Sequence, residues 1–324
     1  MAQVARLSMV VPAFGEADNL RLLLPRLLAQ GAFTHALQVV IVDDHSADST
    51  FEVVREWAAR DPRIHGVRLA RNSGSHAAIL CGLGVANGDA VVVLAADGQD
   101  PPELTEKLVA AWQQGARVVW AVRDGREGES LTTRLLSRAY YAVMNRWSSV
   151  RLPPAGADFL LLDRRVVDEL LRIPEHNASV FALIASLGFQ RAEVPYVKRA
   201  RMSGRSKWTL GRKISLFVDS LVGFSTVPLR AATILGFLHA LGGFGLAALL
   251  AVNKLSGGRL FGVVPIQGWS GLMVVVLISS GTLMAILGIF GEYLWRALEE
   301  VRGRPRFLVE DSVNCEPHRP RKEA

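Results

Sequence analysis

The stretch Gln38-Val39-Val40-Ile41-Val42-Asp43-Asp44 is a run of β-branched apolar residues that ends in two carboxylates. Such a short run predicts a buried strand, and the acidic pair predicts a loop at its carboxyl end. Two other runs follow the same pattern: Leu7–Val11 ends at Pro12, and Ala90–Ala95 is followed by Asp97. Polar loops at the ends of several buried strands are typical of a parallel sheet that binds a ligand at one edge.

Helical patterns separate these strands. Leucines at positions 20, 23, 24, 27 and 28, for example, form one apolar face of a helix. The alternation predicts an α/β domain with a mostly parallel sheet and helices on both faces. The expected helices are Asn19–Gln30, Ser49–Arg60, Ser75–Asn87, a helix from Pro101 or Pro102 through Gln114, Thr132–Val150, Arg164–Leu171 and Ser179–Ser186, and the further strands are Ile64–Ala70 and Arg117–Val122.

Two features argue against other classes of protein. The cysteines, Cys81 and Cys315, provide neither a disulfide framework nor zinc-ligand spacing, so we interpret both as structurally incidental. The pattern Gly82-x-Gly84-x-x-x-Gly88 is superficially like a dinucleotide-binding fingerprint, but it lies within and at the end of a predicted helix. A true fingerprint follows the first strand and opens a helix, so we expect no NAD binding.

Two apolar runs near the C-terminus, Ala231–Val252 and Leu272–Gly291, contain no Asp, Glu, Lys or Arg. At about 1.5 Å rise per residue, ~20 residues cross the ~30 Å hydrocarbon core of a bilayer. Buried core helices are the alternative, but the length and the lack of charge favour two transmembrane helices. The preceding stretch Ser206–Phe224 is basic and amphipathic, which is typical of a helix lying in the membrane interface.

Basic residues set the expected orientation. The loop between the two runs contains only Lys254 and Arg259. The basic residues beside the outer ends of the runs are Arg212, Lys213, Arg230, Arg296, Arg302, Arg304 and Arg306. The positive-inside rule places those outer ends in the cytoplasm. Met1–Ser8 leads straight into a strand without a signal-peptide pattern, so we expect an inner-membrane protein with its head and both termini in the cytoplasm.

The expected organisation follows from these segments. It is a cytosolic head at 1–205, a juxtamembrane helix at 206–228, two transmembrane helices at 229–297 with a connecting loop at 253–270, and a cytosolic tail at 298–324. We expect the tail to be disordered after Asp311 because it is polar. The formal net charge of +7 suits an anionic leaflet and anionic substrates.

Three polar loops are expected to meet at the carboxyl edge of the sheet. They contain Pro12–Glu16, the pair Asp43-Asp44, and Asp97 with Gln99 and Asp100. Converging carboxylates repel one another unless a cation neutralises them. Oxygen ligands suit Mg²⁺ or Mn²⁺, which often bridge to substrate phosphates. Each aspartate alone is equally well explained as a helix cap or a solvated turn, but together they predict a nucleotide-phosphate site.

These loops resemble the nucleotide-sugar domain of the family-2 inverting glycosyltransferases, which has the GT-A fold. The motifs that carry the resemblance are Val11-Pro12-Ala13-Phe14-Gly15-Glu16, Val42 through Thr50 (VDDHSADST), and Ala96-Asp97-Gly98-Gln99-Asp100-Pro101-Pro102-Glu103. Further motifs are similar to the polyprenyl-phosphate glycosyltransferases: Arg71 through His76 (RNSGSH), Asp158-Phe159-x-Leu161-x-Asp163-Arg164, and Arg201-x-x-Gly204-x-Ser206-Lys207-Trp208. The resemblance covers roughly residues 5 to 308, and the two apolar runs match the bactoprenol type.

The resemblance implies roles for individual residues. Asp97 and Gln99 would face the metal, Mg²⁺ or Mn²⁺, and the donor diphosphate. The family often has Asp-x-Asp where this chain has Ala95-Ala96-Asp97, so one metal-side carboxylate is absent and Asp100 is a further candidate. The base would be held by Pro12, Ala13, Phe14, Glu16 and Asp44, and Arg201, Ser206 and Lys207 would close over the phosphates. The other residues of the implied donor-binding set are Asp43, Gly74, His76, Ala96, Asp97 and Gln99.

The implied acceptor is a polyprenyl (undecaprenyl) monophosphate. Its second pKa of ~6 leaves it largely ionised at neutral pH, so it needs little help from a base. Arg123, Arg126 and Arg134 follow the last predicted head strand and are candidates to hold it. Asp158 occupies the family's base position, although orienting the acceptor or forming a structural bond are alternative roles. Backside attack would give a β-linked lipid sugar for cell-envelope glycan modification, with UDP as the expected donor nucleotide.

Several alternatives remain open at this stage. A processive polysaccharide synthase would carry a Gln-x-x-Arg-Trp motif and more spans, which this chain lacks. A non-catalytic membrane scaffold derived from a transferase, or a transferase acting on another membrane acceptor, would share the same motifs. His76 either contacts donor phosphate or caps a helix, His239 lies at a helix–helix contact or serves a function, and Asp163-Arg164 is equally a helix start. The family admits homo-oligomers, and nothing in the sequence indicates nucleic-acid binding.

Overall fold

The computed structural model describes residues 4–123, 158–173, 175, 179–197, 227–256 and 269–315. The chain divides into two compact units. The head unit comprises Met1–Ser220 together with Gly303–Ala324, and the helical unit comprises Leu221–Arg302. The C-terminal tail from Gly303 therefore groups with the head, whereas the sequence predicted a separate tail that is disordered after Asp311.

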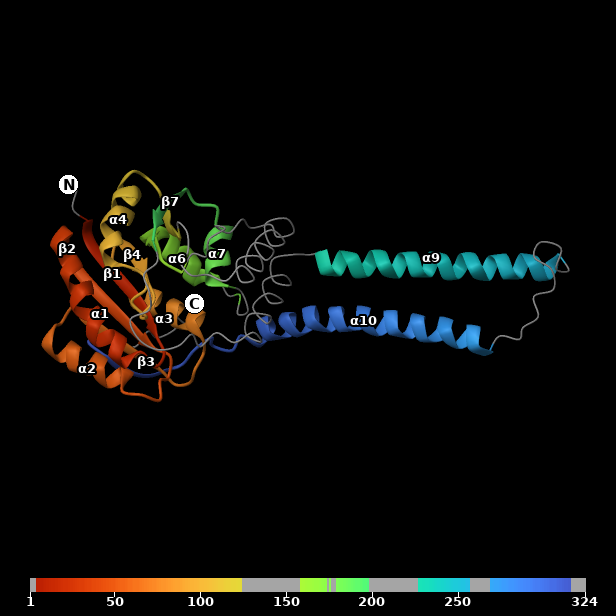
Figure 1. The fold of residues 1–324 in the computed structure, drawn as a ribbon, viewed down its shortest axis with the longest axis horizontal. Helices are drawn as coiled ribbons and strands as arrows, with labels where there is room; N and C mark the ends of the chain where they lie inside the picture. Colours follow the sequence, from red (N-terminus) through yellow and green to blue (C-terminus); the bar gives the residue numbers. More distant parts are fainter. Residues whose placement is uncertain are drawn as a thin grey trace. The chain divides into compact units, whose positions relative to one another are not determined.

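The head is built on one eight-stranded sheet with the order β7-β5-β6-β4-β1-β2-β3-β8 (Figure 1). Its strands are β1 (Val4–Ala13), β2 (Thr34–Asp43), β3 (Ile64–Leu69), β4 (Ala90–Val93), β5 (Val118–Arg123), β6 (Leu160–Asp163), β7 (Arg191–Tyr196) and β8 (Val309–Val313). The central strands β4, β1, β2 and β3 run parallel, and β7 is parallel to β5. Strands β6 and β8 pair antiparallel to their neighbours. The predicted mostly parallel α/β sheet is confirmed.

Helices cover both faces of this sheet. The head helices are α1 (Ala17–Ala29), α2 (Thr50–Arg60), α3 (Ser75–Val85), α4 (Thr105–Gln113), α6 (Arg164–Arg172) and α7 (Val180–Ser186), with short 3-10 turns at Gln30–Phe33 and Pro102–Leu104. The apolar faces of α1, α2 and α4 share one core cluster with the strands. Helix α3 packs on β1 and β2, and α6 and α7 pack beside it. The helix predicted at Thr132–Val150 lies outside the described residues.

The glycines of the fingerprint-like pattern have a packing role. A Cβ on Gly82 would lie 2.4 Å from Val10 Cγ1, and a Cβ on Gly88 would lie 2.5 Å from the backbone nitrogen of Ser8. Glycine therefore allows α3 and the turn after it to approach β1 closely. This structural explanation agrees with the expectation that the pattern is not a dinucleotide site.

Strand β8 corrects the prediction of a disordered tail. Residues 309–313 pair antiparallel with β3, so the polar segment after Asp311 is ordered as far as the description extends, to Cys315. Asn314 donates from Nδ2 to the carbonyls of Ala58 at 2.9 Å and Ile64 at 3.0 Å. The prediction failed because β8 has three consecutive polar residues, Glu310 to Ser312, between two valines, and so lacks the alternation that marks a strand.

The helical unit contains two long helices, α9 (Val227–Leu255) and α10 (Trp269–Arg302). Both predicted apolar runs are therefore helical. In the described part of the chain, Ile278–Arg302 is long and apolar enough to cross a membrane, and the apolar stretch Leu229–Gly245 of α9 is shorter. His239 Nε2 lies 2.9 Å from Ser279 Oγ, which makes the predicted helix–helix contact between α9 and α10.

Candidate functional site

The loops after β1 and β2 are joined by backbone hydrogen bonds. Asp44 N donates to the Ala13 carbonyl at 2.9 Å. Gly15 N donates to Ser46 Oγ at 2.8 Å, and Glu16 N donates to Thr50 Oγ1 at 2.9 Å. The predicted convergence of these loops at the carboxyl edge is confirmed, because residues about 30 positions apart in sequence now form one surface.

The two neighbouring aspartates at the end of β2 make different hydrogen bonds. Asp44 Oδ1 accepts from Ser73 N at 2.7 Å and its Oδ2 accepts from Gly74 N at 2.8 Å, which fixes the start of α3. Gly74 has a φ of +89°, a conformation that glycine adopts without strain. Burial raises the pKa of Asp44, and the two amide bonds partly offset that rise. Asp44 thus connects the β2 loop to the β3 loop.

Asp43 is fully buried inside its own turn. Its Oδ1 accepts from the backbone and hydroxyl of Ser46, and its Oδ2 lies 3.5 Å from Arg68 Nη1. Burial raises the pKa of Asp43, and the Ser46 hydrogen bonds and Arg68 act in the opposite direction. Oδ1 is bonded within the turn, whereas Oδ2 faces Arg68 and has no hydrogen-bond partner among the described residues. Asp43 therefore supports the loop, and its direct contact with donor stays a prediction.

Strand β8 contributes a group that sequence reasoning missed. Glu310 Oε2 lies 3.0 Å from Arg68 Nε and 3.4 Å from His45 Nδ1. Arg68 also donates from Nη2 to the Ser46 carbonyl at 3.2 Å. His45 has a positive φ of 59°, which marks the sharp turn after β2. The tail therefore contacts the loop after β2 through Glu310, and no local sequence signal indicates this link.

The residues implied for the nucleotide base lie together after β1. Ala13 is buried, Pro12 and Glu16 are half-buried, and Phe14 is 37% exposed. Glu16 accepts a short hydrogen bond from Asn19 Nδ2, within the first turn of α1. An aromatic ring that keeps a third of its surface exposed beside a polar loop is suited to stacking on a planar ring.

The loop after β4 contains the residues that the resemblance implies for the donor diphosphate. Gln99 N donates to Asp97 Oδ1 at 3.1 Å across Gly98, whose φ is +70°. Asp97 is 8% exposed, and Ala96 is buried. Leu94, directly after β4, donates its backbone N–H to the Val10 carbonyl of β1 at 3.1 Å. Asp97 and Gln99 therefore share one tight turn at the end of the strand that pairs with β1.

Asp100 is directed away from that turn. It is fully buried, and its Oδ1 accepts from Tyr196 Oη at 2.6 Å. The described residues contain no group of three His, Cys, Asp or Glu side chains that would hold a metal by themselves. A cation at this edge would have to rely on Asp97, with Gln99 as neighbour, and on oxygens of the substrate.

Arg123 and Asp158, expected to act separately, form an ion pair. Arg123 Nη2 lies 2.6 Å from Asp158 Oδ2; the Arg123 side chain is 7% exposed and that of Asp158 is 54% exposed. Burial alone would lower the pKa of Arg123, but Asp158 and then Tyr196 and Asp100 raise it overall. Arg123 Nε is buried without a hydrogen-bond partner in the described structure. Among the described residues, Nη2 is thus held by Asp158 while Nε makes no hydrogen bond.

His76 lies in the first turn of α3 beside this pair. Its ring packs edge-on against Phe181, with centroids 5.4 Å apart. Burial lowers the pKa of His76, while Asp158 acts in the opposite direction, so the imidazole is neutral at pH 7. Its Nδ1 is buried and has no hydrogen-bond partner in the part of the chain that is described. His76 does not cap α3, whose N-cap is Gly74 without a side-chain hydrogen bond. Its contact with donor phosphate stays a prediction.

The remaining predicted site residues lie outside the described residues. They are Arg126, Arg134, Arg201, Ser206 and Lys207. Asp163, by contrast, is a helix start as expected, because its Oδ1 accepts from Arg165 N at 3.0 Å and caps α6.

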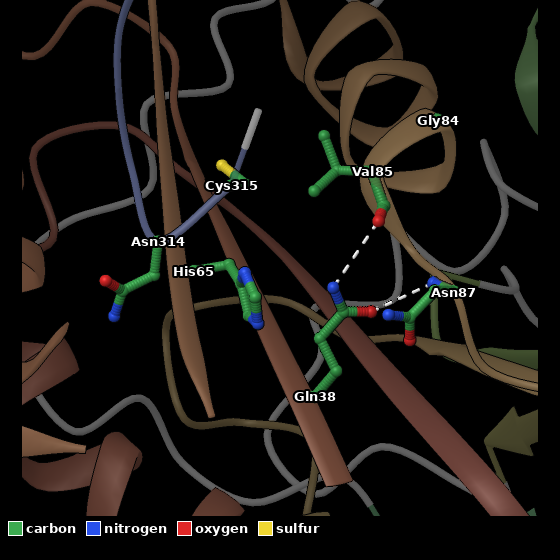
Figure 2. A pocket seen from close by; sticks show the side chains of 7 residues that line it. All are labelled: Gln38, His65, Gly84, Val85, Asn87, Asn314 and Cys315. Carbon is green, nitrogen blue, oxygen red and sulfur yellow. Dashed lines mark hydrogen bonds between the residues drawn. The ribbon is translucent and has the colours of Figure 1, made fainter. Parts of the chain in front are cut away.

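A cavity of about 270 Å³ occurs at the other edge of the sheet (Figure 2). It is lined by Gln38, His65, Gly84, Val85, Asn87, Asn314 and Cys315. Both ends of the Gln38 amide are already hydrogen-bonded: Oε1 accepts from Asn87 N at 2.9 Å, and Nε2 donates to the Val85 carbonyl at 3.4 Å (Figure 2). Oε1 also accepts from Ser8 Oγ at 2.6 Å. His65 lies at the start of β3, so this cavity is at the amino ends of the strands and is separate from the acidic loops.

Comparisons with known proteins agree with the geometry. Residues 8–171 match the family described as Glycosyl transferase family 2. The chain is 34% identical over 320 residues to an uncharacterised glycosyltransferase, YkcC, of Bacillus subtilis, covering 98% of each protein. It is 30% identical to the SfII prophage-derived bactoprenol glucosyl transferase of Shigella flexneri, covering 96% of this chain and 100% of that protein. It is 33% identical to the undecaprenyl-phosphate 4-deoxy-4-formamido-L-arabinose transferase of Edwardsiella ictaluri, covering 95% of this chain and 94% of that protein.

Proposed function

This chain belongs to glycosyltransferase family 2, and from that premise we propose that it moves a sugar from a nucleotide-sugar donor, UDP-linked, to polyprenyl phosphate at the cytoplasmic membrane. Two relatives similar over nearly the whole chain are named as transferases to bactoprenol or undecaprenyl phosphate. The observation that carries the proposal is the single carboxyl-edge surface that joins the β1, β2, β3 and β4 loops beside the Arg123–Asp158 pair.

The donor is held by the loops on the β1–β2 side. Phe14 offers an exposed ring to the base, and Asp44 holds the backbone of Ser73 and Gly74 in place. The start of α3, with His76, then faces the region where phosphate or sugar would lie. Helix N-termini favour anions because their backbone N–H groups and the helix dipole both point towards the ligand.

Transfer requires one bond to form and one to break. An oxygen of the lipid phosphate attacks the anomeric carbon, and the bond from that carbon to the diphosphate breaks. The electron pair leaves with the nucleoside diphosphate, and the anomeric centre inverts. The barrier falls where fixed positive charge meets the developing negative charge on the leaving group. Arg201 and Lys207 are our candidates for that role, with Asp97 and Gln99 holding Mg²⁺ or Mn²⁺ against the diphosphate.

The residues present fit a cation that is shared with substrate. Magnesium is usually bound by one or two protein carboxylates plus substrate phosphates. Asp97 provides one such carboxylate, in a turn ordered by Gln99 N. Bound there, the ion would neutralise charge on the leaving diphosphate. The replacement of the first family aspartate by Ala95 is compatible with this arrangement because the phosphates complete the ligand set.

The Arg123–Asp158 pair is our proposed acceptor site. An ionised phosphate needs no general base, so we assign Asp158 to orienting Arg123 and the acceptor rather than to removing a proton. The buried Nε of Arg123 offers an N–H to a phosphate oxygen. Charged hydrogen bonds of this kind are roughly twice as strong as neutral ones.

The tail supports a hairpin of two membrane spans. Strand β8 follows α10 in the chain and pairs with β3, so the chain returns to the head sheet after α10. A chain that leaves the head and returns to it crosses an even number of times. We therefore propose that α9 and α10 both cross, with the head and both termini cytoplasmic.

Labelled nucleotide sugars test the proposal. Membranes containing the full chain are incubated with UDP-glucose, UDP-galactose, GDP-mannose and UDP-N-acetyl sugars, each with undecaprenyl phosphate, and the lipid is extracted. One labelled lipid monophosphate sugar is expected, and none is expected with Asp97→Asn. Asp89→Asn, at an exposed ion pair with Arg6 far from the loops, is the control that should transfer normally. A chain that binds donor but never labels lipid would support the scaffold alternative, and Asp97→Asn at the parental rate would refute the metal-side assignment.

A further inference from the structure

Tyr196 is the last residue of β7 and is not part of any motif considered above. The exposures along β7 alternate between exposed and half-buried until Tyr196, which is buried at 6% exposure. It pairs in register with Arg123, the last residue of β5. Its ring packs edge-on against Phe159, with centroids 5.9 Å apart. A phenylalanine would make the same ring contact, so the hydroxyl needs a separate explanation.

Tyr196 lies between two parts of the site. Its Oη donates to Asp100 Oδ1 at 2.6 Å, within the loop that also contains Asp97 and Gln99. Arg123 is the register partner of Tyr196 in the neighbouring strand and interacts electrostatically with its side chain, and Arg123 Nη2 contacts Asp158 at 2.6 Å. Tyr196 is therefore bonded to the Asp97–Asp100 loop and adjacent to the Arg123–Asp158 ion pair.

The hydrogen bond between Tyr196 and Asp100 lies in a buried environment that favours keeping it formed. Asp100 is fully buried, and burial of a carboxylate is costly unless it is paired. Burial and then Asp100 raise the pKa of Tyr196, so the phenol stays protonated and keeps donating at any physiological pH. This buried network has a defined geometry and fixes the distance between its ends.

We propose that Tyr196 is a positioning residue for sugar transfer, whose hydroxyl holds Arg123 and Asp158 at a fixed separation from the Asp97–Asp100 loop. The inference rests on the proposed function and deepens it. The reaction needs the acceptor phosphate and the anomeric carbon to be aligned, and small misplacements are costly in rate.

The test is Tyr196→Phe in the full-length protein, which keeps the ring and removes the hydroxyl. We expect kcat to fall about tenfold to a hundredfold, with the KM for nucleotide sugar and the affinity for UDP nearly unchanged. The matched control is Trp112→Phe, which removes a similar aromatic bond to a buried aspartate, from Trp112 Nε1 to Asp163 at 2.7 Å. That variant should lower the melting temperature comparably without changing kcat.

A second pair of variants keeps the test decisive if Tyr196→Phe does not fold. Asp100→Asn retains an acceptor oxygen for the hydroxyl and should keep more activity than Asp100→Ala. Where all variants fold, Tyr196→Phe combined with Asp100→Ala should cost little more than either alone. Equal kcat in Tyr196→Phe and the parent, or equal losses in Tyr196→Phe and Trp112→Phe, would overturn the inference. A parent that transfers no sugar would instead refute the proposed function.

Discussion

Replacing Asn314 should weaken the docking of the C-terminal tail on the head, and the hydrogen bonds of its side chain set the expected loss of docking free energy. Its Nδ2 makes two hydrogen bonds to backbone carbonyls, at 2.9 and 3.0 Å, and its φ is +56°. Each bond contributes about 0.5–1.5 kcal/mol net, so Asn314→Gly, which keeps the backbone conformation, should cost about 1–3 kcal/mol of docking free energy. Asn314→Ala should cost about 1 kcal/mol more because alanine disfavours a positive φ.

Alkylation of Cys315 measures the docked state. Its thiol donates to the Gly66 carbonyl at 3.4 Å and is half-buried, so a maleimide should react when the tail opens. A cost of about 1–3 kcal/mol raises the open population about fivefold to 150-fold, and the labelling rate should rise by the same factor. Mass spectrometry separates this signal from Cys81, which is fully buried and should label slowly in every variant.

Two outcomes decide this prediction. Asp168→Asn, at an exposed ion pair on α6, should label Cys315 at the parental rate. If Asn314→Gly also labels at the parental rate, these two bonds do not hold the tail.

The same reagent, applied in a membrane-impermeant form to sealed vesicles of either orientation, reports the side of the membrane on which Cys315 lies. Labelling from the outer side alone would contradict the proposed hairpin.

Two further predictions concern the stability of the head. Burial alone would raise the pKa of Asp163, but hydrogen bonds from Trp112, Arg117 and Arg165 N outweigh burial and lower it. A carboxyl group whose pKa is lowered on folding stabilises the protein at pH values above its pKa in the unfolded chain. That stability is lost as the pH falls through its pKa in the folded protein. Asp163→Asn should therefore lower the melting temperature at pH 7 and approach the parent below about pH 4, and a pH-independent difference would refute the reasoning. Gly82→Ala places a Cβ 2.4 Å from Val10 Cγ1 and should cost about 1–3 kcal/mol, so an unchanged melting temperature would show that α3 shifts freely.

The outline of the fold follows from local patterns. The run ending at Asp43 and Asp44 is a strand because β-branched residues suit a buried sheet, and the leucines of α1 mark a helix by their spacing. The two antiparallel strands were less predictable. Strand β6 has only four residues, inside a motif that sequence reasoning used for function, and β8 becomes a strand only by pairing with β3.

The candidate site divides in the same way. Sequence placed Pro12–Glu16, Asp44 and Asp97 at one edge, because parallel strands bring their carboxyl ends together. It did not distinguish the buried, turn-forming Asp43 from Asp44, which reaches across to Ser73 and Gly74. That difference depends on which way each side chain faces in the folded sheet.

By itself, then, the sequence determined the α/β order, the acidic loops and the two apolar helices, because each depends on the type and spacing of residues that are close together in the chain. Only the tertiary structure decided that Arg123 is paired with Asp158, 35 residues later, and that Glu310 reaches Arg68 across 242 residues. Pairings of this kind depend on how the sheet brings distant segments together, and no local periodicity encodes them.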